Sequence, residues 1–116
     1  MEQQNTRVAD DREARRFELF LEDELAGFID YKPTNAGLSF LHTEIDPRFG
    51  GRGLGSVLVG GALDAVRSEG LSVLPFCPFV RRYIQDHPEY LELVPADRRA
   101  RFELPAETPE APEPTA

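Results

Sequence analysis

The chain has 116 residues, of which 41% are hydrophobic, and its 13 basic and 21 acidic side chains give a formal net charge of −8. This length allows one domain with a single hydrophobic core. One cysteine excludes an internal disulfide framework, no segment approaches the roughly 20 apolar residues of a membrane span, and the acidic charge argues against sequence-independent nucleic-acid binding.

The first part of the chain is predicted to be a flexible segment followed by an antiparallel meander. Residues 1–13 carry four acids and two arginines without apolar periodicity, so we expect a flexible acidic N-terminus. Apolar side chains at every second position predict a strand over residues 15–21. Further strands are expected over residues 25–31 and 38–45, and short links between three consecutive strands predict antiparallel pairing.

The second part of the chain is predicted to alternate between helices and strands. Four glycines within residues 50–55 precede apolar residues at helical spacing, which predict a helix over residues 56–67. A short strand over residues 71–74 and a helix over residues 79–86 are expected next. Residues 95–102 are expected to add a final helical turn or two.

The C-terminal end differs in composition from the rest. Residues 105–116 hold four of the ten prolines, three glutamates and no basic residue, so they are expected to form a disordered tail. The folded domain is therefore predicted to span residues 14–104. Its fold class is α/β (α+β), a mainly antiparallel twisted sheet with a central helix after a glycine-rich loop.

The glycine-rich loop is the most informative feature of the sequence. Gly51, Gly53 and Gly55 remove side chains where backbone N–H groups and a helix N-terminus could hold a pyrophosphate, and Arg48 and Arg52 could add positive charge. The loop lacks the Gly-Lys-Ser/Thr ending of a P-loop, and the spacing of its glycines differs from a Rossmann fingerprint. An ordinary glycine-rich turn between a strand and a helix is the alternative.

Residues 51–59 resemble motif A of the GNAT superfamily of acyl-CoA-dependent N-acetyltransferases. Gly53 and Gly55 match its two small positions, and Gly50 stands where Gln or Arg is usual. Residues 42–45 and the run C-P-F-V-x-x-Y-I-x-x-H-P-E-Y over residues 77–90 are similar to very small single-domain GNAT proteins, the YjdJ-like group. The resemblance covers residues 17–90.

The resemblance implies a minimal GNAT-like fold that transfers an acetyl group from acetyl-CoA to a primary amine without a metal. The strands over residues 38–45 and 71–74 would splay and hold the pantetheine arm of coenzyme A between them. Helices that usually follow the first strand are absent from this sequence, which opens the acceptor side. The residues implied in coenzyme A binding are Ile45, Gly50, Gly51, Arg52, Gly53, Leu54, Gly55, Ser56, Cys77 and Arg81.

Four residues are candidates for the chemistry of transfer. His42 and Glu44 are two apart on a predicted strand and share a face, so either could relay a proton from the amine, or both could be ordinary surface or structural residues. Cys77 could carry an acyl group or form a mixed disulfide with coenzyme A, or it could be a small buried apolar residue. Tyr83 falls where many GNAT members carry a general acid, and a core aromatic is the alternative.

Other function classes remain open at this point. A non-catalytic module that binds coenzyme A or acyl-CoA would need the same loop, and a regulatory interaction domain could use the glycines structurally. The expected partners are acetyl-CoA and an amine acceptor, which could be a polyamine, an amino acid, another small amine or a protein lysine. Nucleic acid and membrane are not expected as partners. The single cysteine and the lack of a recognisable signal peptide predict a cytoplasmic location.

Overall fold

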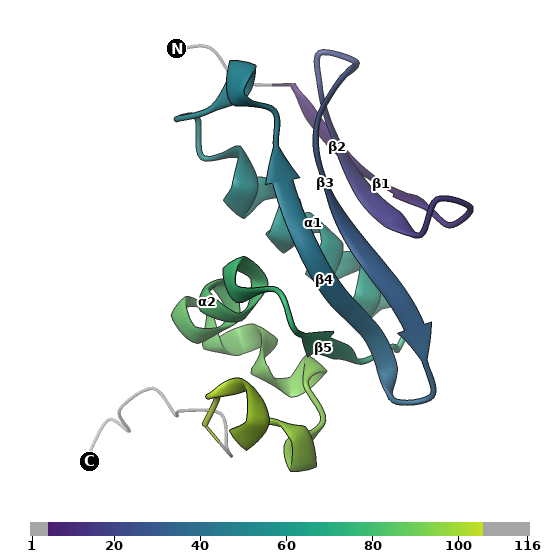
Figure 1. Ribbon diagram of the computed structural model, residues 1–116, viewed down its shortest axis with the longest axis vertical. Helices are drawn as coiled ribbons and strands as arrows, with labels where there is room; N and C mark the ends of the chain where they lie inside the picture. Colours follow the sequence, from purple (N-terminus) through teal and green to yellow (C-terminus); the bar gives the residue numbers. More distant parts are fainter. Residues whose placement is uncertain (1–4, 106–116) are drawn as a thin grey trace, which may run out of the picture.

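The computed structural model describes residues 5–105, and these form one five-stranded sheet with helices packed on one side (Figure 1). The strands lie in sequence order, the first three pairings are antiparallel, and the last is parallel. This confirms the predicted α/β class and the mainly antiparallel sheet. The elements are β1 (Thr6–Asp11), β2 (Arg16–Leu21), β3 (Glu24–Thr34), β4 (Gly37–Ile45), α1 (Leu54–Ser68), β5 (Val73–Pro75) and α2 (Pro78–Asp86).

Strand β1 was not predicted, and the expectation of a flexible segment is wrong for residues 6–11. Val8 pairs with Leu19 of β2 and packs against Gly61 of α1, where an added Cβ would lie 2.7 Å from the valine side chain. β1 is an edge strand, so its charged side chains can reach water and the strand tolerates acidic residues. These acids interrupt the apolar alternation by which a strand is predicted from sequence. Residues 1–4 and 106–116 lie outside the described part of the chain, and so does the predicted tail apart from Pro105.

Strands β2 and β3 are joined directly by a tight turn. Glu22 and Asp23 both have left-handed backbone angles, with φ of 51° and 69°, as a two-residue hairpin of the right twist requires. The link therefore has no room for a helix. This agrees with the expected absence of the helices that would otherwise cover one side of the sheet.

The hydrophobic core lies between the sheet and α1, which passes behind the strands in Figure 1. Alternate residues of β2 and β3, such as Leu19 and Ile29, are fully buried against Leu58 and Leu63 of α1. The intervening residues of the same strands point to the opposite side, which we call the open face. No helix of the described chain covers the strands there (Figure 1).

The C-terminal segment closes the far end of the core with short 3-10 turns. These are η2 (Pro88–Leu93), η3 (Ala96–Arg98) and η4 (Ala100–Phe102), so the helical turns expected over residues 95–102 are present in 3-10 form. The Phe102 ring is buried and meets the Phe76 ring edge to face, at 5.0 Å between centroids. This packing anchors the segment beside β5.

Candidate active site

The loop before α1 presents unpaired backbone donors at the start of the helix. Gly51 and Gly53 have φ of 78° and 72°, a backbone conformation that is strained for residues with a side chain. An added Cβ at either position would have no atom within 4 Å, so the space beside both glycines is open. Gly53 is the N-cap of α1, no side chain of the described residues caps it, and the first turn holds no acid. The first-turn N–H groups, from Leu54 to Ser56, therefore have no acceptor within the helix and suit an anion.

A cavity of about 250 Å³ lies between α1 and α2, next to this loop. Its wall includes Phe79, whose ring lies so close to Gly55 that an added Cβ would be 2.6 Å from it. A side chain at position 55 would displace this ring, which explains the small residue there. The residues that line the cavity are Ser56, Phe79, Arg82, Tyr83, Asp86 and His87. The structure thus brings together Ser56 and Tyr83, which sequence reasoning had named separately. It places Arg82 beside them and adds Phe79.

Tyr83 is half-buried between the two helices. An added Cβ at Gly60 of α1 would lie 2.7 Å from its hydroxyl oxygen, and its ring stacks on His87 at 4.0 Å. Burial raises the pKa of Tyr83, and the negative charges of Glu89 and Asp64 raise it further. The phenol therefore keeps its proton at neutral pH, as a general acid must.

The pairing of β4 with β5 ends abruptly beside this region. β5 pairs only with residues 38–40 of β4, and the Cys77 N–H then donates to the Phe40 carbonyl at 2.8 Å before the chain turns into α2. The rest of β4, up to Ile45, pairs with β3 alone. All three residues of β5 pair with β4, so β5 ends here rather than diverging from it. The splaying of two strands that the GNAT resemblance implies stays a prediction.

The two sides of β4 carry different chemistry. His42 Nε2 and Glu44 Oε2 are 3.0 Å apart on the open face, with 56% and 60% of their side chains exposed, so the prediction that they share a face is confirmed. Thr43 points to the covered side, where its Oγ1 lies 3.3 Å from Cys77 Sγ. Cys77 is only 5% exposed. The thiol and the His42–Glu44 pair therefore lie on opposite sides of the strand and do not form one cluster.

Arg81 lies away from the glycine-rich loop, whereas Arg82 lines the cavity beside it. The Arg81 guanidinium donates to the carbonyls of Pro75 and Phe76, at 3.4 and 3.1 Å, and lies 3.8 Å from a Glu103 carboxylate oxygen. It therefore holds the C-terminal segment onto the end of β5. The pair of adjacent arginines was visible in the sequence, but only the rotation of α2 decides which of them faces the cavity.

Three further residues of the predicted coenzyme A site are placed as follows. The Gly50 backbone is extended, and its N–H donates to the Pro47 carbonyl at 3.1 Å, so this donor is already used within the protein. The Arg52 guanidinium lies over the Phe49 ring, 5.6 Å from its centroid, at the outer end of the loop. Ile45 is half-buried beside Gly27 of β3, its partner in the sheet.

Comparison with known proteins decides the family. Residues 16–93 match the family model described as GCN5-related N-acetyl-transferase. The chain belongs to this family. It is similar to Protein NATD1 of Xenopus tropicalis, with 31% identity over 91 residues that make up 74% of this chain and 83% of that protein. Protein NATD1 of Mus musculus is also 31% identical over 91 residues, which make up 74% of this chain and 82% of that protein.

The matched segment of the chain, residues 16–93, includes every candidate site residue. It begins at the first residue of β2 and ends in η2, so β1 and the last two 3-10 turns lie outside it. The narrower resemblance to the YjdJ-like group stays a prediction. Within residues 5–105, no helix has the length and apolar character to cross a bilayer, and no three His, Cys, Asp or Glu side chains gather as metal ligands.

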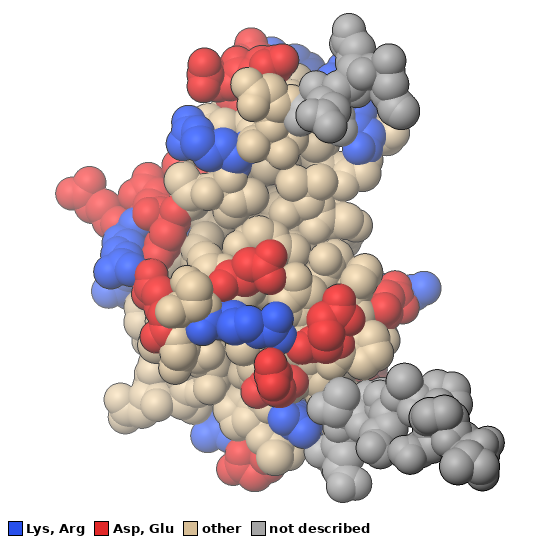
Figure 2. All heavy atoms as spheres, turned by 180° about the vertical axis from the view of Figure 1, so that it is seen from behind, with Lys and Arg blue, Asp and Glu red and all other residues tan. Residues whose placement is uncertain are grey.

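Surface charge does not single out a partner on the helical side of the molecule. Figure 2 shows this side from behind, with acidic and basic side chains interspersed around uncharged surface. Ion pairs such as Arg12–Glu69 and Arg67–Glu92 account for part of this mixture. The net acidity of the chain is therefore weak support for any one class of acceptor.

Proposed function

We propose that this protein transfers an acetyl group from acetyl-CoA to a primary amine. The observation that carries the proposal is the uncapped, glycine-rich start of α1, which lies in the family's matched region and follows the part of β4 that extends beyond its pairing with β5. The first provides donors for a pyrophosphate, and the second leaves a strand edge along which an extended arm can lie.

The coenzyme A end of the site would be held mainly by backbone. The N–H groups of Leu54, Gly55 and Ser56 would donate to pyrophosphate oxygens. Arg52 of the loop and Arg82 of α2, which lies 3.4 Å from an Asp86 carboxylate oxygen, would add positive charge. Gly51 and Gly53 would allow the phosphate to approach the backbone closely because no Cβ intervenes. Arg81 is not part of this proposal, since its guanidinium donates to the Pro75 and Phe76 carbonyls and pairs with Glu103.

The acceptor amine would be activated on the open face. Its ammonium loses a proton to the His42–Glu44 pair, the free amine nitrogen bonds to the thioester carbonyl carbon, and the carbon–sulfur bond breaks. The departing thiolate takes a proton, and Tyr83 is the proposed donor because it remains protonated at neutral pH. Tyr83 lies on the covered side, between α1 and α2, so the thioester would cross the edge of β4 beyond Phe40, with its carbonyl carbon towards the open face and its sulfur towards the helices. The attacking nitrogen loses its second proton as the amide forms, and this proton restores the Tyr83 hydroxyl through water. The products are the amide, coenzyme A with a free thiol, and one proton that the His42–Glu44 pair releases to solvent.

Direct transfer accounts for the geometry better than an acyl-cysteine intermediate. Cys77 is almost completely buried, and Thr43 lies against its sulfur. A thioester carbon could reach this sulfur only if β4 or α2 moved. We therefore propose a packing role for Cys77 and a direct attack by the amine.

The test combines binding and turnover on the full chain. Isothermal titration with coenzyme A should show one site, and a free-thiol assay with acetyl-CoA and an amine panel should show thiol release that depends on amine. Binding without amine-dependent release would favour a non-catalytic acyl-CoA module. Absence of coenzyme A binding would overturn the proposal and return the loop to a structural role.

A further inference from the structure

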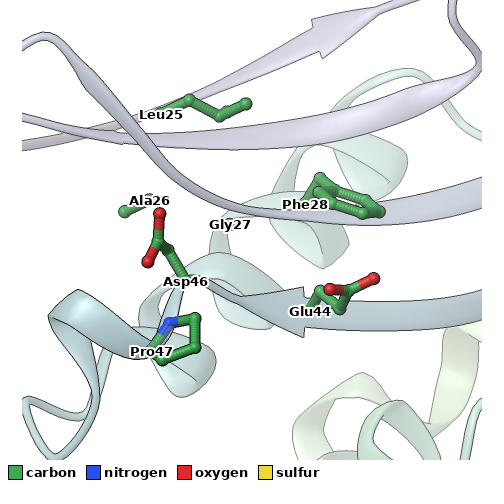
Figure 3. Close-up of a pocket in the computed structure, with 7 residues that line it drawn as sticks. All are labelled: Leu25, Ala26, Gly27, Phe28, Glu44, Asp46 and Pro47. Carbon is green, nitrogen blue, oxygen red and sulfur yellow. The ribbon is translucent and has the colours of Figure 1, made fainter.

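A second cavity, of about 240 Å³, lies on the open face at the ends of β3 and β4 (Figure 3). It is separate from the cavity between the helices and shares no lining residue with it. Its lining residues are Leu25, Ala26, Gly27, Phe28, Glu44, Asp46 and Pro47. Glu44 belongs to this cavity and to the pair proposed to remove the amine proton, so an amine that occupies the cavity would lie beside its base.

The two carboxylates of the cavity are not equivalent. Asp46 accepts from the Arg48 backbone N–H at 2.9 Å and from its guanidinium at 3.2 and 3.1 Å. These hydrogen bonds lower the pKa of Asp46, so its charge is kept but is already matched by a cation. Glu44 is paired with His42 instead, and this partner carries a full positive charge only when protonated. The cavity therefore offers one unmatched carboxylate and suits one ammonium group.

The remaining wall of the cavity is apolar. Leu25 is 37% exposed although it is a large aliphatic residue on a sheet, and Phe28 projects from β3 directly opposite Glu44 of β4. Pro47 and Ala26 complete the apolar side. A ligand with an apolar group beside its ammonium would cover Leu25 and remove this surface from water. A second ammonium would meet either apolar side chains or the Asp46–Arg48 pair.

We propose that this cavity is the acceptor site and that it takes a primary amine with one charge and a compact alkyl or aryl substituent. The inference rests on the proposed acetyl transfer and narrows its substrate class. Diamines, polyamines and a lysine within a peptide are excluded as preferred acceptors, because the first two carry charge beyond Glu44 and the last carries a chain that the cavity does not hold.

The first test is binding, measured without turnover. Phenethylamine is titrated into the isotope-labelled full chain with coenzyme A present, and backbone amide shifts are mapped by NMR. Shifts centred on Gly27, Phe28 and Glu44 are expected. The variant Leu25→Asn should weaken this binding at least tenfold. The matched control Leu71→Asn changes an equally exposed leucine, 41% against 37%, outside the cavity, and should leave the binding unchanged.

The second test is selectivity among acceptors. The value of kcat/KM for phenethylamine and hexylamine should exceed that for putrescine, spermidine and a lysine peptide at least tenfold, and Leu25→Asn should reduce this preference. A preference for the polyamines, or amide shifts centred elsewhere, would overturn the inference and leave acetyl transfer standing. Loss of coenzyme A binding itself would instead contradict the proposed function, so the two failures are distinguishable.

Discussion

The two sides of β4 differ in packing and in exposure to water. On the covered side, Thr43 and Cys77 meet in a tightly packed contact beneath the helices. On the open side, His42 and Glu44 form a hydrogen-bonded pair with more than half of each side chain in water. Successive residues of one strand point to opposite faces, so residues 42–44 are divided between the packed side and the open face. Nearness in sequence is therefore a poor guide to which of these residues act together.

The same division separates stability from function across the whole sheet. The covered face holds the buried aliphatic and aromatic side chains, and the open face holds the His42–Glu44 pair and the second cavity. The open face is accessible because β2 and β3 are joined by a two-residue turn. Substitutions on the two faces should consequently have different effects, and the following experiments measure that difference.

The largest effect is expected for the base on the open face. Glu44→Gln should lower kcat by about 100- to 10,000-fold, because general base catalysis is lost while folding is not affected. Cys77→Ala, across the strand, should keep turnover within a few-fold of the parent protein. Glu13→Gln, an exposed carboxylate in the turn after β1, is the control for loss of charge alone. If Cys77→Ala abolished turnover and Glu44→Gln did not, the assignment of the two faces would be reversed.

Adjacent residues of β3 test the same contrast in stability. Ile29 is fully buried on the covered face, so Ile29→Ala should reduce the free energy of unfolding by about 2–5 kcal/mol. Phe28→Ala, on the open face, should cost clearly less although it removes a larger side chain. Urea denaturation of both variants measures the difference. Equal losses would mean that the open face is packed as tightly as the core.

A pair of glycines at the two ends of α1 separates backbone strain from binding. Gly53 and Gly70 have φ of 72° and 70°, and neither position has an atom within 4 Å of an added Cβ. Alanine at either site should therefore cost about 1–2 kcal/mol of stability. Only Gly53→Ala should also weaken coenzyme A binding in calorimetry, because only Gly53 adjoins the free N–H groups. An equal loss of affinity in Gly70→Ala would show that the effect comes from the helix as a whole.

The smallest effect is expected in the stability of the fold at alkaline pH, and it comes from Tyr90 on the covered side. Burial and a 2.7 Å hydrogen bond to Asp64 raise the pKa of Tyr90 to about 12, against about 10 in the unfolded chain. The protonated phenol thus stabilises the fold below pH 10, and this contribution is lost as the pH rises towards 12. Tyr90→Phe lacks this component, so its stability should fall less than that of the parent protein over the same interval. Parallel curves in chemical denaturation would contradict the shift.

Much of the fold follows from local patterns. Phe17, Leu19 and Leu21 alternate because one face of β2 is buried, and the glycines after residue 49 mark a turn that side chains could not make. Strand β1 could not be predicted from the sequence, because it is stabilised by contacts between distant residues. These are its pairing with β2 and the packing of Val8 against Gly61. The 3-10 form of the C-terminal turns could not be predicted for the same reason, because it depends on the packing of Phe102 against the distant Phe76.

The sequence by itself determined the loop chemistry, the strand-helix order and the shared face of His42 and Glu44, because turn propensity and side-chain periodicity are properties of neighbouring residues. Only the tertiary structure decided that Cys77 is buried and that Arg82 rather than Arg81 faces the cavity beside α1. It also decided that the Asp46 carboxylate is paired with the Arg48 guanidinium whereas Glu44 is paired with His42. Each of these depends on how one element is rotated against another. That rotation is set by packing across the whole domain, which no local pattern records.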